Sequence, residues 1–233
     1  MQTDVNPVIL RPADFAAEAA RFILDHARAA IAARGLFRLA LSGGNTPRIV
    51  HAQLFALGAD LPWNRVQITF GDERCVPPEH ADSNFRMAKE SLLDAVDIPA
   101  GNVFRIRGEI APADAAREYE DQLAAFANRL GEPRYVHDLV LLGLGEDGHT
   151  ASLFPGSPAL EETARNVLPT IGPKPPPQRI TMTFPLLNAA RHVAFLVTGA
   201  GKHPLVDEIV AGGSAHPAGR VRPTAGAVTW FVG

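Results

Sequence analysis

The segment Gly145-Glu146-Asp147-Gly148-His149-Thr150 contains the residue types with the clearest catalytic chemistry in this chain. A carboxylate, Asp147, and an imidazole, His149, stand two positions apart. A histidine with an ordinary pKa of about 6.5 can take a proton from water near neutral pH. A neighbouring carboxylate can orient the ring and stabilise its charged form. A lone loop histidine more often only bonds to the backbone, but the position of this one after a buried-looking strand favours a general base.

A second segment, Ser42-Gly43-Gly44-Asn45-Thr46-Pro47, lies between an expected strand and an expected helix. Its glycines allow backbone N–H groups to approach an anion closely, and the start of a helix adds positive potential. Taken alone, the segment fits an anion-binding turn and a simple capped turn equally well. It lacks the Gly-Lys-Ser/Thr ending of a nucleoside-triphosphate loop.

A third segment, Asp72-Glu73-Arg74, is a charged triplet at the end of an expected strand. An arginine can hold a carboxylate or a phosphate with two parallel hydrogen bonds. The two carboxylates would either orient Arg74 or bind sugar hydroxyls. Charged triplets are more often surface ion pairs, but the position after a buried-looking strand favours a functional role.

Two further cations, Arg179 and Lys202, complete the candidate set. Arg179 opens an expected strand after a proline-rich loop, and Lys202 follows a glycine-containing turn before an expected helix. Together they could hold a phosphate dianion, with each charge-assisted hydrogen bond contributing about 1.5–3 kcal/mol. Individually, such side chains are more often solvated surface charges.

No residue pattern points to a metal or a cofactor. The H-E-x-x-H spacing of zinc hydrolases is absent. Gly143 to Gly148 matches G-x-G-x-x-G, but prolines follow closely and no acidic strand end lies about 20 residues further on, so a dinucleotide site is not expected. The single cysteine, Cys75, excludes an intramolecular disulfide and is interpreted as a loop residue.

The elements that must position these residues alternate between strands and helices. Helices are expected at about 12–34, 47–57, 82–96, 112–130 and 202–211, and strands at 36–41, 66–70, 103–106, 138–144, 179–183, 193–197 and 228–232. The continuous apolar run at 138–144 is typical of a strand covered on both faces of a parallel sheet. Four prolines between 172 and 178 indicate a loop.

This alternation predicts an α/β fold with a doubly wound, mostly parallel sheet and helices on both faces. No repeat or linker divides the sequence, so residues 1–233 are expected to form one domain. In such a sheet the ligand site lies beyond the carboxyl ends of the strands. The segments 42–47, 71–74 and 145–150 all lie there, which is the main argument for a site.

Composition limits the classes of partner. The chain has 233 residues, of which 46% are hydrophobic and 20% charged, and its net charge is −3, which argues against a nucleic-acid partner. The N-terminus does not have the pattern of a signal peptide, and no stretch approaches the ~20 apolar residues of a membrane span. We expect a cytoplasmic protein without a membrane partner that is a monomer or a weak homo-oligomer.

Several blocks of the sequence resemble the 6-phosphogluconolactonase family, and they cover nearly the whole chain in order. The third block is the most specific. The blocks are Leu41 to Pro47; Gly71 to Arg74 with Val76-Pro77 and Ser83-Asn84; Gly143 to Gly156; Arg179 to Thr183; and Gly199 to Lys202.

The resemblance implies a fold similar to glucosamine-6-phosphate deaminases and hydrolysis of 6-phospho-D-glucono-1,5-lactone to 6-phosphogluconate without a cofactor or metal. By position, His149 would be the base that activates water, Asp147 would orient it, and Arg74 would position the substrate and stabilise the oxyanion. Arg179 and Lys202 would bind the phosphate. The remaining implied contacts are Ser42, Gly43, Gly44, Thr46, Asp72 and Asn84.

Two alternatives stay open from the sequence. A sugar-phosphate deaminase or isomerase of the same fold would resemble this chain through Asp147-Gly148-His149, but that family usually continues with Phe-Asn-Glu-Pro, and here Phe154 stands at the glutamate's place. A non-catalytic sugar-phosphate sensor would keep the phosphate contacts and lose the base, whereas His149 and Asp147 are both present.

Overall fold

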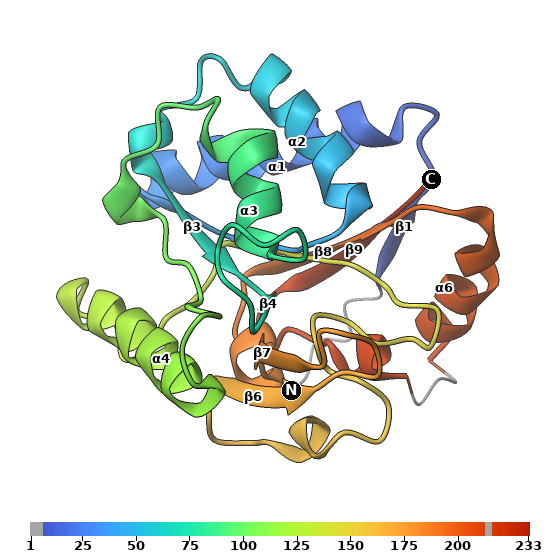
Figure 1. The fold of residues 1–233 in the computed structure, drawn as a ribbon. Coiled ribbons are helices and arrows are strands. Elements are labelled where there is room, and N and C mark those ends of the chain that lie inside the picture. The colour runs from blue at the N-terminus through green and yellow to red at the C-terminus, as the bar shows by residue number, and fades with distance from the viewer. Residues whose placement is uncertain (1–6, 213–215) are drawn as a thin grey trace.

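The computed structural model describes residues 7–212 and 216–233, and a six-stranded sheet forms its centre. The strands run in the order β1-β9-β8-β5-β2-β3 and each neighbouring pair is parallel (Figure 1). The strands are β1 (Val8–Leu10), β2 (Phe37–Leu41), β3 (Val66–Phe70), β5 (Leu139–Leu142), β8 (His192–Val197) and β9 (Ala227–Val232). The expected parallel sheet is therefore confirmed.

Helices cover both faces of this sheet, as the alternating pattern predicted. One face carries α1, α2 and α3, and the other carries α4, α6 and a smaller sheet (Figure 1). The helices are α1 (Phe15–Arg34), α2 (Asn45–Leu57), α3 (Asn84–Ala88), α4 (Pro112–Arg129), α5 (Phe184–Leu187) and α6 (His203–Val210). β2, β3 and β5 are buried along their whole length, and the continuous apolar run of β5 has the composition that a core on both faces of the sheet requires.

Local capping signals set the ends of the first helix. The side chain of Asp14 accepts a hydrogen bond from the backbone N–H of Ala17 at 3.1 Å, which satisfies one of the free donors of the first turn. Gly35 ends α1 in the left-handed conformation at φ 74°, and its N–H donates to the carbonyl of Ile31. The predicted helix was therefore correct at its end and three residues too long at its start.

A second sheet was not predicted. It has three antiparallel strands in the order β4-β7-β6, namely β4 (Asp72–Arg74), β7 (Gln178–Met182) and β6 (Val167–Ile171). The charged triplet 72–74 was expected only at the end of the preceding strand, because a short polar segment has no strand pattern of its own. β6 was missed because it contains Pro169, which an edge strand tolerates. The expected strand 179–183 exists, but it belongs to this sheet.

Two other expectations need correction. The segment 103–106 is not a strand, because Val103 forms an isolated bridge to Ile68 and the chain then leaves the sheet. The helix expected over 82–96 begins as predicted, with Ser83 capping the N–H of Arg86, but α3 ends at Ala88 and a π-helical turn follows. Short turns lie at Trp63–Arg65, Lys89–Leu93, Ala100–Asn102, Pro158–Glu161, Ala200–Lys202 and Pro217–Arg220.

Aromatic and aliphatic side chains of both sheets join one buried cluster. Tyr119 on α4 is fully buried there, and its hydroxyl accepts a hydrogen bond from the N–H of Phe70 and donates to the carbonyl of the same residue. This contact ties α4 to the end of β3, directly before the charged triplet. In the described part of the chain, no helix is both long and apolar enough to cross a membrane.

Two buried histidines make folding dependent on pH. His51 on α2 bonds to Ser91, and burial, followed by the charge of Arg48, lowers its pKa to about 4. His137, before β5, bonds to Thr69, and burial lowers its pKa to about 3. Both side chains are therefore neutral in the folded protein at neutral pH.

We predict that the free energy of unfolding falls as the pH is lowered from 7 to 5. In the unfolded chain these histidines take up protons below about pH 6.5, whereas the folded chain resists protonation. Each contributes up to about 1.4 kcal/mol per pH unit. Denaturant unfolding should therefore show a smaller pH slope for His51→Gln than for wild type. The half-exposed His80 gives the control His80→Gln, and equal slopes in wild type and His51→Gln would contradict the prediction.

Candidate active site

A cavity of about 170 Å³ opens at the carboxyl ends of β2, β3 and β5. The three polar segments expected at this edge all contribute to its walls. The lining residues are Ser42, Gly43, Gly44, Asp72, Arg74, Asn84, Gly143, Leu144, Gly145, His149, Thr150 and Ala151. Parallel strands end at the same edge of a sheet, so the loops that follow them meet there.

Asp147 and His149 are in direct contact. Nδ1 of the imidazole lies 2.5 Å from a carboxylate oxygen of Asp147, and the same oxygen accepts the backbone N–H of His149 at 3.2 Å. Because an ionised carboxylate can only accept, the contact places the proton on Nδ1 and leaves Nε2 as the basic nitrogen. The His149 side chain is 31% exposed, so water can reach it.

The pKa of the Asp147 carboxyl lies below its ordinary value. Partial burial acts in the opposite direction, but the hydrogen bonds from the ring and the backbone of His149 outweigh it. Asp147 is therefore ionised at neutral pH, and its charge can stabilise a protonated His149 ring.

The loop that carries this pair is closed on itself. The N–H of Gly145 donates to the carbonyl of His149 at 2.9 Å, and the N–H of Gly148 donates to the carbonyl of Gly145 at 3.0 Å. A Cβ atom on Gly145 would stand 2.1 Å from Nδ1 of His149. Position 145 therefore requires glycine, because the imidazole of His149 lies directly over the Cα atom and leaves no space for a Cβ atom.

A buried carboxylate, Asp72, connects the walls of the cavity. It accepts hydrogen bonds from the amide of Asn84 at 3.0 Å and from the hydroxyl of Ser152 at 2.5 Å. Asn84 in turn packs against Gly43, where a Cβ atom would meet the Asn84 side-chain oxygen at 1.8 Å. Asp72 and Asn84 therefore hold together the loops that contribute Gly43 and Ser152.

Glu73 has a different role from its neighbours. It is buried and accepts the backbone N–H groups of Arg74, Asn84 and Phe85, together with the Ser83 hydroxyl. Burial raises the pKa of Glu73, and these hydrogen bonds oppose the rise. Of the two carboxylates in the triplet, Asp72 lines the cavity and Glu73 anchors the start of α3.

Two arginines lie opposite each other across β4 and β7, since Arg74 pairs with Arg179 in the register of the small sheet. Each makes a hydrogen bond to a backbone carbonyl, yet the Nε of each is buried without a partner in the described structure. Burial, and next the charge of Arg74, lower the pKa of Arg179. The hydroxyl of Ser42 is likewise buried and unpartnered. Such donors are what an anionic ligand would satisfy.

Lys202 contacts the wall of the cavity at Leu144. It precedes α6, and its ammonium donates to the carbonyl of Leu144 at 2.7 Å. Thr46 lies near the same edge, where its hydroxyl bonds to that of Thr198 at 2.6 Å. Thr46, Arg179 and Lys202 stand around the cavity and are not among the residues that line it.

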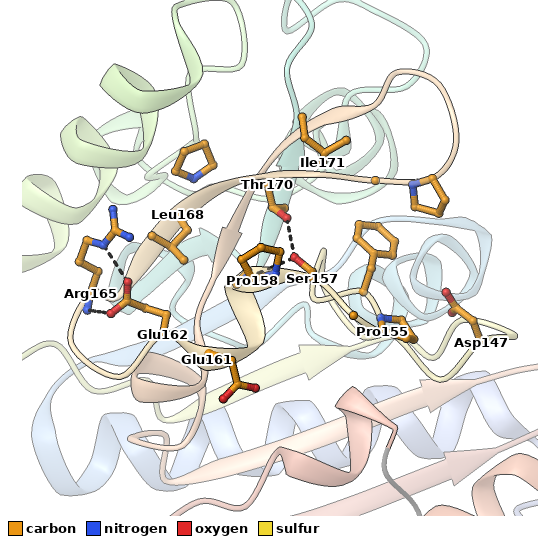
Figure 2. A pocket seen from close by; sticks show the side chains of 16 residues that line it. Asp147, Pro155, Ser157, Pro158, Glu161, Glu162, Arg165, Leu168, Thr170 and Ile171 are labelled. Carbon is orange, nitrogen blue, oxygen red and sulfur yellow. Dashed lines mark hydrogen bonds and ion pairs between the residues drawn. The ribbon is translucent and has the colours of Figure 1, made fainter.

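A larger groove of about 860 Å³ lies beside the cavity (Figure 2). Asp147 stands at one end of it, and Pro155, Leu168 and Ile171 contribute apolar walls (Figure 2). The ring of Phe154 also lines the groove and stands 4.6 Å from the His149 ring. No spacing in the sequence predicted the roles of Ser152 and Phe154, because Ser152 bonds the distant Asp72 and the approach of the Phe154 ring to His149 depends on how the loop folds.

Metal ligation was not expected from the sequence. Within residues 7–212 and 216–233, no three His, Cys, Asp or Glu side chains converge as metal ligands would. Cys75 is half-buried, and burial raises the pKa of its thiol to about 11, so it stays protonated at neutral pH.

Comparison with known proteins identifies the family. A family model described as glucosamine-6-phosphate isomerases/6-phosphogluconolactonase matches residues 11–230. The match spans almost the whole chain, so the protein belongs to this family of α/β proteins. The 6-phosphogluconolactonase of Synechocystis sp. is 47% identical over 183 residues, which make up 78% of this chain and 75% of that protein.

Solved structures agree with the assignment. The 6-phosphogluconolactonase of Trypanosoma brucei superposes with a TM-score of 0.86 at 34% identity and covers 97% of this chain and 95% of its own. A monomeric glucosamine-6-phosphate deaminase superposes with a TM-score of 0.78 at 19% identity over 97% of this chain and 96% of its own. The second likeness shows the fold alone, and confirms the expected similarity to deaminases at that level.

We predict that Gly145→Ala breaks the contact between Asp147 and His149. The added Cβ atom would overlap the imidazole, and the half-exposed ring can rotate away without unfolding the chain. The proton resonance of His149 Nδ1 should therefore shift or disappear in NMR spectra, while the unfolding midpoint stays close to wild type. Gly101→Ala, where a Cβ atom meets nothing within 4 Å, is the matched control. An unchanged Nδ1 resonance in Gly145→Ala would refute the prediction.

Proposed function

We propose that this chain hydrolyses 6-phospho-D-glucono-1,5-lactone to 6-phospho-D-gluconate, a reaction of the oxidative pentose phosphate pathway. The observation that carries the proposal is the paired Asp147 and His149 at the mouth of a cavity whose other walls hold unpartnered donors. Membership of the family and the lactonases among its relatives support the same activity.

The reaction begins with a water held by the free Nε2 of His149. The imidazole takes one proton while the water oxygen bonds to the lactone carbonyl carbon, and the ionised Asp147 stabilises the imidazolium. The tetrahedral oxyanion then collapses, the bond from that carbon to the ring oxygen breaks, and the ring oxygen receives the proton from His149. Water adds across the ester bond, and His149 returns to its neutral form.

Developing negative charge on the carbonyl oxygen needs donors fixed in advance. Arg74 lines the same cavity as His149 and has a buried, unpartnered Nε. We assign it to position the substrate and stabilise the oxyanion. Asp72 and Asn84 hold the walls through their own hydrogen bond and offer oxygen and amide atoms to sugar hydroxyls.

The phosphate of the substrate lies at the opposite end of the sugar from the lactone carbonyl. We assign its binding to Arg179 and Lys202, with Ser42, Gly43, Gly44 and Thr46 at the start of α2 supporting them. Two arginines face each other across β4 and β7, and their guanidinium groups bond only backbone carbonyls among the described residues, which supports this assignment. Binding energy at the phosphate orients the reacting carbonyl for attack.

The proposal also covers the domain organisation, location, oligomeric state, cofactors and partners of the chain. The chain acts as one domain over residues 1–233, in the cytoplasm, as a monomer or weak homo-oligomer, and needs no metal or cofactor. Its partner is a small phosphorylated sugar lactone and not a nucleic acid or a membrane. The net charge of −3 supports the absence of a nucleic-acid partner, and the buried cluster shared by both sheets supports one domain.

We expect His149→Ala to lower the rate of lactone hydrolysis at neutral pH by at least tenfold, since a general base typically contributes about 10²–10⁴ in rate. Acid release from freshly made lactone measures it. His80→Ala removes a histidine outside the cavity and serves as the control. If wild type and His149→Ala both hydrolysed the lactone no faster than it opens without protein, the chain would instead be a sugar-phosphate-binding protein. Release of ammonia from glucosamine 6-phosphate by wild type would instead favour a deaminase.

Arg179→Gln and Lys202→Met should each raise KM about tenfold or more with a smaller effect on kcat. Loss of a charge-assisted hydrogen bond to phosphate costs about 1.5–3 kcal/mol. Steady-state kinetics with the phosphorylated lactone checks this, and Lys89→Met, on an exposed side chain that does not line the cavity, is the control. An unchanged KM in both variants would place the phosphate elsewhere.

A further inference from the structure

The loop that carries Asp147 and His149 is hydrogen-bonded to the segment around His216, which is distant in the sequence. Nδ1 of His216 lies 3.0 Å from the backbone carbonyl oxygen of Asp147. Two residues later, the N–H of Ala218 donates to the carbonyl of Gly148 at 3.0 Å. Two consecutive carbonyls of the loop are therefore bonded to one short segment that precedes β9.

His216 also packs against the loop. A Cβ atom on Gly148 would stand 2.4 Å from both Cγ and Nδ1 of the His216 ring. Gly148 has φ 78°, a conformation that favours glycine. The ring therefore lies against the Cα atom of Gly148, and the glycine provides both the backbone turn and the space that this contact requires.

The hydrogen-bond acceptor determines which ring nitrogen of His216 carries a proton. A backbone carbonyl can only accept a hydrogen bond, so Nδ1 must carry the proton. The other nitrogen, Nε2, lies 3.7 Å from a carboxylate oxygen of Glu208 on α6. His216 thus stands between α6 and the Asp147 peptide group, and its side chain is 30% exposed.

The peptide group of Asp147 decides where its carboxylate points. Its carbonyl is bonded to His216, while its side chain is bonded to the ring of His149. A rotation of this peptide group would move the carboxylate that holds Nδ1 of His149. In an effective site, catalytic groups are held to within a fraction of an ångström by such supporting contacts.

We propose that His216 is a positioning residue that fixes the Asp147 carboxylate, and through it the imidazole of His149, by donating Nδ1–H to the Asp147 carbonyl. The kinetic part of this inference rests on the proposed lactone hydrolysis. His216 itself does not touch the reacting atoms in this assignment.

The kinetic test compares His216→Ala with His216→Asn. We expect the alanine variant to lose about tenfold in kcat with KM changed less than twofold, because a misplaced base affects the chemical step and leaves phosphate binding intact. Asparagine can donate from its Nδ2 to the same carbonyl, so it should recover most of kcat. A fall in kcat that asparagine does not restore, or an unchanged kcat in the alanine variant, would overturn the proposal.

Asn188→Ala provides the matched control. Asn188 anchors the same segment through the carbonyl of Arg220 at 3.3 Å and the N–H of Arg222 at 2.7 Å, without contacting the loop. It should leave kcat near wild type. An equal loss in Asn188→Ala and His216→Ala would show that general loosening of the segment causes the effect, and would refute a positioning role.

An NMR measurement separates this inference from the proposed function. The Nδ1 proton and the ring nitrogens of His149 should shift in His216→Ala and return toward wild type in His216→Asn, whether or not the lactone is hydrolysed. Wild type without lactonase activity would overturn the proposed function, and the NMR comparison would still decide the positioning role. Identical His149 spectra in wild type and His216→Ala would overturn it.

Discussion

The buried carboxylate of Asp72 joins loops that come from distant parts of the chain. It follows β3, accepts from Asn84 at the start of α3, and accepts from Ser152 beyond the catalytic loop. Asn84 rests on Gly43 after β2. Parallel strands bring these loops to one edge, but hydrogen bonds to a single acceptor set their spacing. These buried hydrogen bonds hold the loops together and so help to maintain the shape of the cavity.

Charged side chains have different partners at the two ends of the parallel sheet. At the amino ends, Arg38 on β2 forms two hydrogen bonds with Glu132, and Asp138 accepts from Arg34 and from the N–H of Arg38. At the carboxyl ends, Arg74 and Arg179 face each other, and the guanidinium group of each donates to a backbone carbonyl. Ion pairs contribute to the fold at one end, whereas the two facing arginines at the other end have no carboxylate bonded to them among the described residues and can bind an anion.

Contacts within one loop set the position of the His149 ring. Gly145 leaves space for the imidazole, Asp147 orients it, and the ring of Phe154 stands beside it. Phe154 lines the adjoining groove, so its ring stands between that groove and the His149 ring of the cavity. The small antiparallel sheet adds Arg179 opposite Arg74. The cavity is therefore built on the rigid carboxyl edge of the parallel sheet, and the small antiparallel sheet adds side chains beside it.

The sequence by itself determined the parallel α/β architecture and the three polar segments at one sheet edge, and it indicated Asp147 and His149 as the candidates for the proposed base and its partner. These follow from local information: buried apolar runs, capping residues at Asp14 and Ser83, and glycines in turns. Only the tertiary structure decided the antiparallel sheet, the separate role of Glu73, and the contacts of Ser152 and His216. These depend on pairing between residues far apart in the chain, and no local periodicity records which distant backbone group a side chain will meet.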